Sequence, residues 1–521
     1  MLAGPSARPA ILSLLAERRF SQAHAKLREL AQQSPRDATI ANLEGVVFLV
    51  EGQLAEAESA FQHAIALDPR FALALRNLGI TFWHEHKMEG ARRAFAAALE
   101  RDPSDRLAHL YWGQIAFADQ DCPGAVSSFT RAGGLLSSMP VAKFMDAVCT
   151  LRLGRGHDAA LLLEQMGTVP RIPPEAIFKL AVEAGSRREY QVARAALKLL
   201  PTDYPDPYTR AYDEGLAAYN AGDDAGAVRT LRSLLSRHFA RPEVYDLLGN
   251  ALERQGLTSK QPKLVEEAYE AYRTGIYGDP HYLPNFIDIG RLALSLGNYE
   301  LCEQLLTQGL EQNPQAQQLF LERGVAYALS SKSAEAASDF EAALTLTPYD
   351  SMPYLTSAML AIQEGRNRDA VKVLQDGIDR AHPPNAWMYF LLARSLYKTG
   401  VDAPETEARI RASLKEAMRL DPTLTEAFAL AGHVWLKAGD VEQAIRFFET
   451  AHRLEPDNSH YVYALAMARR TRGDAQGAAK EFQTFRDLEA ANNPARTREF
   501  FMKIFANPAS DIALHDTTNT K

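Results

Sequence analysis

Apolar and small residues recur along the chain at the spacing of an α-helix. Within residues 72–105 they form two segments, with Leu75, Leu78, Ile80 and Phe82 in the first and Ala91, Phe95 and Ala98 in the second. Residues three or four positions apart lie on one face of a helix. Pro103 restricts the residue before it to extended backbone, so the second helix is expected to end near Asp102. The pattern predicts two helices joined by a turn, with Gly79 at a point where they approach closely.

The same pattern returns at a fixed interval. The decapeptides AFQHAIALDP and AFAAALERDP occupy residues 60–69 and 94–103, and DFEAALTLTP and FFETAHRLEP occupy residues 339–348 and 447–456. Their prolines are 34 residues apart from Pro69 to Pro103, and the same interval separates Pro280, Pro314 and Pro348. A period of this length is typical of a repeat array. A unit of 34 residues is too small to bury a core alone, so we expect each unit to stack on its neighbours.

These units resemble the tetratricopeptide repeat (TPR) family. The family pattern has a small residue in the first helix and an alanine–aromatic–alanine series in the second, followed by proline. The clearest units carry Gly45/Ala57/Phe61/Ala64/Pro69, Gly79/Ala91/Phe95/Ala98/Pro103, Gly324/Ala336/Phe340/Ala343/Pro348 and Gly432/Ala444/Phe448/Ala451/Pro456. The resemblance implies an all-α fold, an α-solenoid superhelix of about fourteen helix–turn–helix repeats.

Segments that break the 34-residue repeat pattern suggest how the array is divided. Prolines crowd into VPRIPP and PTDYPDP between Val169 and Pro207. We therefore expect an N-terminal arm over 1–169, a degenerate repeat and hinge over 170–207, and a C-terminal arm over 208–494. A capping helix is expected over 495–508 and a disordered tail over 509–521. The insertions TSKQPKL (258–264) and VDAPETE (401–407) are expected to lengthen turns.

Composition excludes several classes of partner and location. The 65 acidic residues outnumber the 57 basic ones, which disfavours nucleic-acid binding. No stretch approaches the roughly 20 apolar residues of a membrane span, and the start of the chain is a poor signal peptide, so we expect a cytoplasmic protein. The three cysteines, Cys122, Cys149 and Cys302, fit no disulfide framework or zinc spacing and are expected to be small core residues.

Catalytic motifs are missing from the sequence. It contains no phosphate-binding GxxxxGK[ST] loop, no GxSxG elbow and no GxGxxG turn. In WHEHKMEG, His84 and His86 are two residues apart, whereas a zinc-binding HExxH motif needs two histidines four apart on one helix face. We therefore expect no enzymatic activity, no cofactor and no metal.

The resemblance implies that the first helix of each unit lines a concave groove. Its second, fifth, ninth and twelfth positions carry mainly apolar and aromatic residues with isolated arginines. The candidate contact residues are Arg76, Ile80, Trp83, Leu110, Phe117, Met352, Leu355, Met359, Trp387, Phe390, Arg394 and Tyr397. Leu73, Leu107 and Ile362 fit either the groove or a contact between neighbouring helices, and Trp112 and Trp435 are expected in the core.

The family's clamp for acidic C-termini can be checked residue by residue. It needs Lys and Asn, then Asn, then Lys and Arg in three successive repeats. Here Asn77 is followed by Leu107 and Tyr111, and Asn250 is followed by Pro284 and Asp288, so no window has the set. That class of partner is not expected.

The favoured function is a non-enzymatic scaffold or adaptor. Its groove would hold another protein through an amphipathic helix or an extended apolar peptide. Two alternatives remain open at this point. One is a chaperone or assembly factor for a secretion, pilus or envelope polysaccharide system. The other is a regulatory subunit that targets a separate enzyme.

Overall fold

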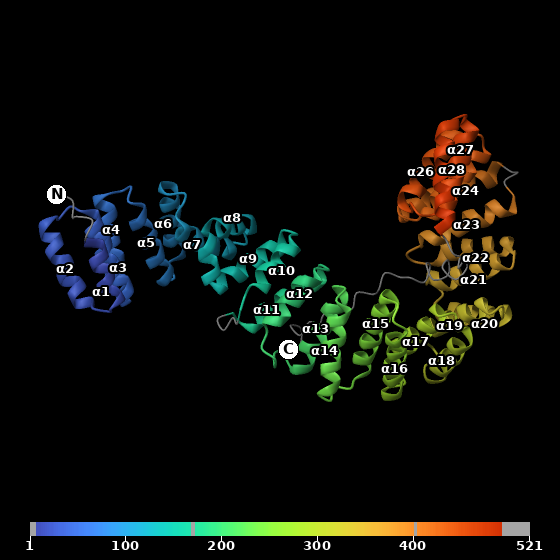
Figure 1. Ribbon diagram of the computed structural model, residues 1–521, viewed down its shortest axis with the longest axis horizontal. Helices are drawn as coiled ribbons and strands as arrows, with labels where there is room; N and C mark the ends of the chain where they lie inside the picture. Colours follow the sequence, from blue (N-terminus) through green and yellow to red (C-terminus); the bar gives the residue numbers. More distant parts are fainter. Residues whose placement is uncertain (1–6, 168–171, 401–403, 492–521) are drawn as a thin grey trace. The chain divides into compact units, whose positions relative to one another are not determined.

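The structure is a computed structural model that describes residues 7–167, 172–400 and 404–491. In these residues it has 28 α-helices, one short 3-10 segment and no strand, which confirms the all-α solenoid (Figure 1). They divide into two compact units, with the boundary after Thr230.

The helices of the first unit are α1 (Ala7–Ala16), α2 (Phe20–Gln33), α3 (Ala38–Glu51), α4 (Leu54–Leu67), α5 (Ala72–His84), α6 (Met88–Arg101), α7 (Arg106–Ala118), α8 (Cys122–Ala132), η1 (Gly133–Ser138), α9 (Pro140–Arg152), α10 (Gly156–Glu164), α11 (Pro174–Ser186), α12 (Tyr190–Leu199) and α13 (Pro207–Asn220). The boundary falls inside α14 (Asp224–Ser236).

The helices of the second unit are α15 (Pro242–Ser259), α16 (Pro262–Gly278), α17 (Leu283–Ser295), α18 (Tyr299–Gln312), α19 (Gln317–Leu329), α20 (Ser333–Leu346), α21 (Ser351–Gln363), α22 (Asn367–Arg380), α23 (Ala386–Thr399), α24 (Pro404–Leu420), α25 (Thr425–Lys437), α26 (Val441–Leu454), α27 (Ser459–Arg472) and α28 (Ala475–Ala491). Consecutive helices pack in pairs, such as α5 with α6 and α19 with α20, as the repeat pattern predicts.

The proline-rich region is largely helical. Its described residues include α11 and α12, which pack on each other, and α12 also contacts α10. The hinge assigned to 170–207 stays a prediction. The capping helix and the disordered tail assigned to 495–508 and 509–521 lie outside the described residues.

The longer turn expected at 258–264 is wrong. Helix α15 continues to Ser259 and α16 begins at Pro262, so the extra residues lengthen these helices to 18 and 17 residues. Lys260 adopts a left-handed φ of 54° and lets the chain reverse direction, while Pro262 takes an N-terminal helix position where its missing N–H costs no hydrogen bond. Residues 401–403 of the other insertion lie outside the described residues, and α24 begins at Pro404.

Glycine in the first helix admits an aromatic ring from the second. A Cβ atom at Gly432 would lie 2.5 Å from Cε1 of Phe448, which has no exposed surface. The same contact joins Gly45 to Phe61, Gly79 to Phe95, Gly113 to Phe129 and Gly324 to Phe340. Alanine replaces the glycine, and leucine the phenylalanine, in the buried pairs Ala147/Leu163, Ala181/Leu197 and Ala358/Leu374. Gly290 is an exception, because this glycine faces the smaller Leu306 and not a phenylalanine. The two positions therefore compensate each other in volume at most pairs.

This compensation makes a prediction for Gly324 and Phe340. Gly324→Ala is expected to destabilise the second unit, because overpacking costs about 1–3 kcal/mol and helix propensity returns only about 1 kcal/mol. Phe340→Leu alone leaves a cavity. The double variant recreates the alanine–leucine pair, so we expect a favourable coupling energy of about 0.5–3 kcal/mol. Denaturant unfolding of the four chains measures it, and strictly additive losses would contradict the packing rule.

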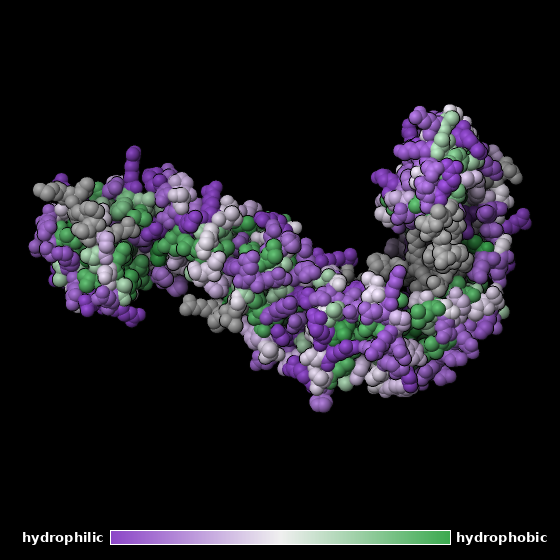
Figure 2. All heavy atoms as spheres, in the orientation of Figure 1, coloured by the Kyte–Doolittle hydropathy of each residue, from purple (hydrophilic) through white to green (hydrophobic). Residues whose placement is uncertain are grey.

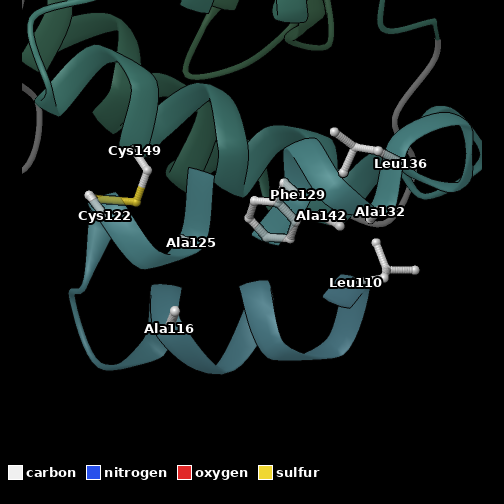
Figure 3. Close-up of a cluster of buried hydrophobic side chains, with 9 residues drawn as sticks. All are labelled: Leu110, Ala116, Cys122, Ala125, Phe129, Ala132, Leu136, Ala142 and Cys149. Atoms are coloured by element: carbon white, nitrogen blue, oxygen red, sulfur yellow. A yellow bond between two sulfur atoms is a disulfide. The ribbon is translucent and has the colours of Figure 1, made fainter. Parts of the chain in front are cut away.

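The expectation that all cysteines are unpaired core residues is wrong for two of them. Cys122 begins α8 and Cys149 lies in α9, and their Cα atoms are 4.8 Å apart with the sulfurs joined in a disulfide. Figure 3 shows this bond at one end of the buried cluster around Phe129. The two cysteines are 27 positions apart in the sequence, and the packing of α9 against α8 brings them together, which sequence spacing does not reveal. Cys302 is free and buried.

Candidate functional site

The first helices of neighbouring pairs contact one another from α1 to α9 in the first unit and from α15 to α25 in the second. In the first unit α5 contacts α7 and α7 contacts α9, and in the second unit α15 contacts α17, α17 contacts α19, and α21 contacts α23. Among the described helices, the only extensive contact between second helices of neighbouring pairs joins α10 to α12. Helices that approach each other more closely lie on the inside of a curved stack. We call the surface formed by the first helices the inner face.

Five of the twelve residues assigned to the groove are buried by the protein itself. They are Ile80, Leu110, Leu355, Met359 and Phe390, with exposed fractions of 8%, 2%, 0%, 3% and 4%. Ile80 packs in the cluster around Phe95, and Leu110 packs in the cluster around Phe129. Contact between successive first helices covers these positions, so a partner cannot reach them in this structure.

The other seven are half-buried side chains of the first helices. They are Arg76, Trp83 and Phe117 in the first unit and Met352, Trp387, Arg394 and Tyr397 in the second. Leu73, Leu107 and Ile362 are half-buried as well. Trp112 and Trp435, expected in the core, are also only half-buried. Figure 2 shows hydrophilic residues over much of the visible surface, with hydrophobic residues exposed between them.

In the first unit, an aromatic series crosses from α5 to α7. Trp83 meets Tyr111 edge to face at 5.8 Å, and Tyr111 stacks on Phe95 at 5.3 Å. Arg76 donates to Asp105 Oδ2 at 3.3 Å. Asp105 also caps α7 by accepting from the Leu107 and Ala108 backbone N–H groups at 3.0 Å. Arg76 therefore joins two neighbouring repeats.

In the second unit, α23 carries the aromatic patch, which we define as Trp387, Arg394 and Tyr397. Trp387 packs edge to face on buried Phe390 with ring centres 5.7 Å apart, and Asn385 caps the helix through the Trp387 N–H at 2.8 Å. The ammonium group of Lys437 lies 5.9 Å from the Tyr397 ring centre. Burial lowers the pKa of Arg394. The patch therefore combines rigid aromatic surface with a partly desolvated guanidinium.

The second unit also holds an acidic cluster that the sequence reasoning missed. We define it as Asp246, Asn250 and Glu253 on α15 and Asp288 on α17. Asn250 donates to Asp288 Oδ2 at 2.8 Å, and the Tyr272 hydroxyl donates to Glu253 Oε2 at 3.0 Å. Asp246 is only 5% exposed, and its Oδ1 has no hydrogen-bond partner among the described atoms.

Arg291 lies beside the acidic cluster but pairs with a carboxyl outside it. Its Nε donates to Glu322 Oε1 on α19 at 2.9 Å, and its nearest approach to Asp288 is 3.8 Å. Gln318 also donates to Glu322 Oε1, at 3.3 Å. Glu322 therefore has its own hydrogen-bond donors. The three carboxyls of the acidic cluster accept hydrogen bonds mainly from neutral groups, the Asn250 amide and the Tyr272 hydroxyl.

Burial and mutual repulsion favour the protonated form of the carboxyls in the acidic cluster. Burial, together with the neighbouring Asp288 carboxyl, raises the pKa of Asp246 to about 8. Burial also raises the pKa of Glu253 to about 7 and raises the pKa of Asp288. The raised pKa favours a protonated Asp246 beside Asp288 at neutral pH.

These pKa values predict how stability depends on pH. The folded state keeps protons on Asp246 and Glu253 that the unfolded chain releases above about pH 4. Because the folded state binds more protons between about pH 4 and 8, stability falls as pH rises through this window, by at most about 1.4 kcal/mol per pH unit for each group. We expect the second unit to melt at a higher temperature at pH 5 than at pH 8. Asp246→Asn should flatten this difference, and an unchanged slope would contradict the assignment.

The sequence contains a pattern that could have indicated the acidic cluster. The groove positions applied to α15 give Glu243, Asp246, Asn250 and Glu253, which are polar and mostly acidic. The predicted groove is based on apolar anchors, and Asn250 and Asp288 enter the prediction only as positions that do not fit the basic clamp. In the described residues, no group of three or more His, Cys, Asp and Glu side chains is arranged to hold a metal ion.

The sequence profile of the tetratricopeptide repeat family matches the chain at residues 9–72, 42–105, 76–135, 287–351 and 430–493. Helix α15 lies outside these ranges. A DnaJ homolog subfamily C member 7 homolog of Schizosaccharomyces pombe is 29% identical over 113 residues, which are 21% of this chain. The match spans only 22% of that relative's length.

Solved structures with low sequence identity also align with the chain. Yeast Tom70 is 16% identical, with a TM-score of 0.41, and the alignment covers 84% of this chain and 95% of that one. The Cut9–Hcn1 structure of the APC/C is 12% identical, with a TM-score of 0.38, and covers 89% and 96%.

Among the helices of the described ranges, none is both long enough and apolar enough to cross a bilayer. The helix pairs, the glycine–phenylalanine contacts and the five profile matches agree on the family. The chain belongs to the tetratricopeptide repeat family.

Proposed function

We propose that the chain is a non-catalytic scaffold whose inner face holds a segment of a partner protein. The observation that carries this proposal is the aromatic patch on α23. Trp387 and Tyr397 stay half-exposed on a helix whose aliphatic side chains and phenylalanine are buried, namely Met388, Phe390, Leu391, Leu392 and Leu396. Aromatic and arginine side chains on rigid elements are the usual anchors of protein interfaces.

A few large side chains on both partners can supply the free energy that binding requires. A micromolar complex needs about −8 kcal/mol, and ordering a flexible segment costs roughly 2–5 kcal/mol more. Each large side chain contributes about 1.5–3 kcal/mol when fully buried. Half-buried Trp387, Tyr397 and Met352 supply part of this from the scaffold, and the partner's own apolar side chains supply the rest. An amphipathic helix or an extended apolar peptide provides such side chains at regular spacing.

The cellular location is part of the same proposal. A cytoplasmic location follows from the sequence reasoning, whereas disulfides such as Cys122–Cys149 are more typical of oxidising compartments. The location stays a prediction. Because both sulfurs are buried in the folded chain, acid quenching of the cells followed by alkylation of thiols in denaturant reports the redox state of this pair.

Site-specific photo-crosslinking tests the proposed function. Benzoylphenylalanine replaces Trp387 or Tyr397 on the inner face, or Tyr277 at the end of α16 as a matched control, since Tyr277 is an aromatic residue with 71% exposure on a second helix. The modified chains are irradiated in their native cells. We expect the same partner segment to be crosslinked from positions 387 and 397 and not from 277. Crosslinking from 277 alone, or from none of the three, would exclude the inner face as the binding surface.

A further inference from the structure

We propose that residues 499–505 of this chain, EFFMKIF, bind its own inner face and cover the aromatic patch on α23. They belong to the segment 492–521, which follows α28 and lies outside the described residues. The inference deepens the proposed function and rests on it in one respect, because a partner that uses the patch must first displace this segment. The chain therefore keeps its binding surface covered until a competing partner arrives.

The segment after α28 has the apolar pattern that the patch requires. Its large apolar residues are one, three and four positions apart, a spacing that places them on one face of a helix. They are Phe500, Phe501, Ile504 and Phe505. The proposed function calls for an amphipathic helix or an extended apolar peptide, and such a sequence supplies either. The chain thus contains an occupant of its own for the inner face.

The register of the last helix pair shows where the chain leaves α28. Arg469 of α27 pairs with Glu481 of α28 at 3.1 Å, and the rings of Tyr463 and Phe485 lie 5.2 Å apart. Residue numbers therefore rise along α28 as they fall along α27, which means that the two helices are antiparallel. At this register, the end of α28 lies beside the start of α27.

From that point the segment can reach the patch. Because paired helices are antiparallel, the first helices run in one direction and their starts share an edge. Thr425, at the start of α25, donates to Glu455 Oε1, just before α27, at 2.7 Å, and α25 contacts α23, whose second residue is Trp387. The path from α28 through α27 and α25 to α23 is about 24–30 Å, at about 8–10 Å between neighbouring helices. Residues 492–500 span about 30 Å when extended.

Charges and rings follow each other in the order that this path requires. Arg496 and Arg498 come directly before the apolar residues. The path passes the half-buried carboxyls of Glu455 and Glu426 near the starts of α27 and α25, and then reaches the guanidinium of Arg394 in the patch. Aromatic rings attract such a cation. The segment therefore presents basic side chains to the carboxyls and phenylalanine rings to the guanidinium.

Covalent connection makes even a weak contact sufficient. A short flexible linker gives an effective concentration of about 1 mM. A contact whose Kd would be about 0.1 mM between separate molecules is then about nine-tenths occupied within one chain. A free ligand of the patch competes with this occupant, so its affinity falls about tenfold.

Crosslinking within the purified full chain tests where the segment lies. Benzoylphenylalanine replaces Trp387 or Tyr397 on the inner face, Tyr463 on α27, or the control Tyr277 on α16. Tyr463 is 42% exposed and contacts Phe482 of α28, so it reports a segment that instead covers the last helix pair. Unlabelled and isotopically labelled chains are mixed, so that mass spectrometry separates crosslinks within one chain from crosslinks between copies.

We expect crosslinks from positions 387 and 397 to residues 499–505 of the same chain, and none from position 277. A crosslink to this segment from position 463 alone would place it on the last helix pair and overturn the inference. Crosslinks that form only between differently labelled copies would overturn it as well, because the occupant would then be a second copy.

A fluorescent peptide of residues 495–508 measures the competition. It is titrated into three full chains, which are the wild type, Phe501→Asp/Ile504→Asp and the matched control Ile512→Asp/Leu514→Asp. The control changes two apolar residues of the same segment outside the EFFMKIF sequence.

The variant Phe501→Asp/Ile504→Asp should bind the peptide about tenfold more tightly than the wild type and the control do, because its patch is uncovered. Adding Trp387→Ala/Tyr397→Ala should remove this gain. Crosslinking in the unmutated segment gives an independent answer if the added alanines destabilise α23.

The inference and the proposed function fail in distinguishable ways. Equal peptide affinities for wild type and Phe501→Asp/Ile504→Asp, with no crosslink from 387 or 397 to the segment, would overturn the inference. The proposed function still stands in that case if crosslinking in native cells finds a partner segment. If the purified chain crosslinks to itself as expected but native cells yield no partner at 387 and 397, the contact within the chain holds and the proposed function fails.

Discussion

Phe448→Ala is expected to lower the free energy of unfolding of the C-terminal repeats by about 3–5 kcal/mol. Phe448 has no exposed surface, fills the space left by Gly432, and meets the His433 ring edge to face at 5.0 Å. Removing the ring leaves a cavity between α25 and α26 that neither helix can close without moving its neighbour. Hydrogen exchange of the backbone amides in α25–α28 measures the loss.

The adjacent Phe447 supplies a matched control. It is half-buried and packs on Trp435 with ring centres 5.2 Å apart. Phe447→Ala should cost less than half as much, because its ring is partly in contact with water already. Equal losses for the two variants would show that the glycine–phenylalanine contact is not what holds the pair together.

Reducing the Cys122–Cys149 bond is expected to cost the first unit about 3–4 kcal/mol, the loop-closure entropy of a crosslink across about 28 residues. The bond ties the start of α8 to α9 beside the Phe129 cluster, so its loss frees both helices in the unfolded chain. Guanidinium unfolding with and without reductant measures the difference.

The variant Cys122→Ala/Cys149→Ala is the control for this experiment. It should start at the reduced value and show no further response to reductant, because Cys302 is free and buried in the second unit. A wild-type chain that is equally stable in both redox states would contradict a structural role for the disulfide.

The paired-helix fold could be predicted because its determinants are local. Gly79, Ala91, Phe95 and Pro103 mark where the helices touch and where the second one ends, and the structure places each residue in that role. The insertion at 258–264 lengthens two helices instead of the turn between them, and its proline lies at the first position of α16, where proline is common.

The accessibility and the neighbours of the candidate site residues are set by contacts between repeats. Assigning groove positions within a single repeat cannot predict these contacts. Leu355, Met359 and Phe390 occupy groove positions, yet the neighbouring first helices bury them. Asp246 and Asp288 are 42 residues apart in the numbering, and only the packing of α15 on α17 brings their carboxyls together. The disulfide was missed for the same reason.

Hydrogen exchange of the full chain, with and without a synthetic peptide of the crosslinked partner segment, tests most directly whether a partner lies along the first helices. The account predicts slower exchange in α15, α17, α21 and α23, with no change in their partners α16, α18, α22 and α24. Protection confined to the second helices or to the turns would contradict it.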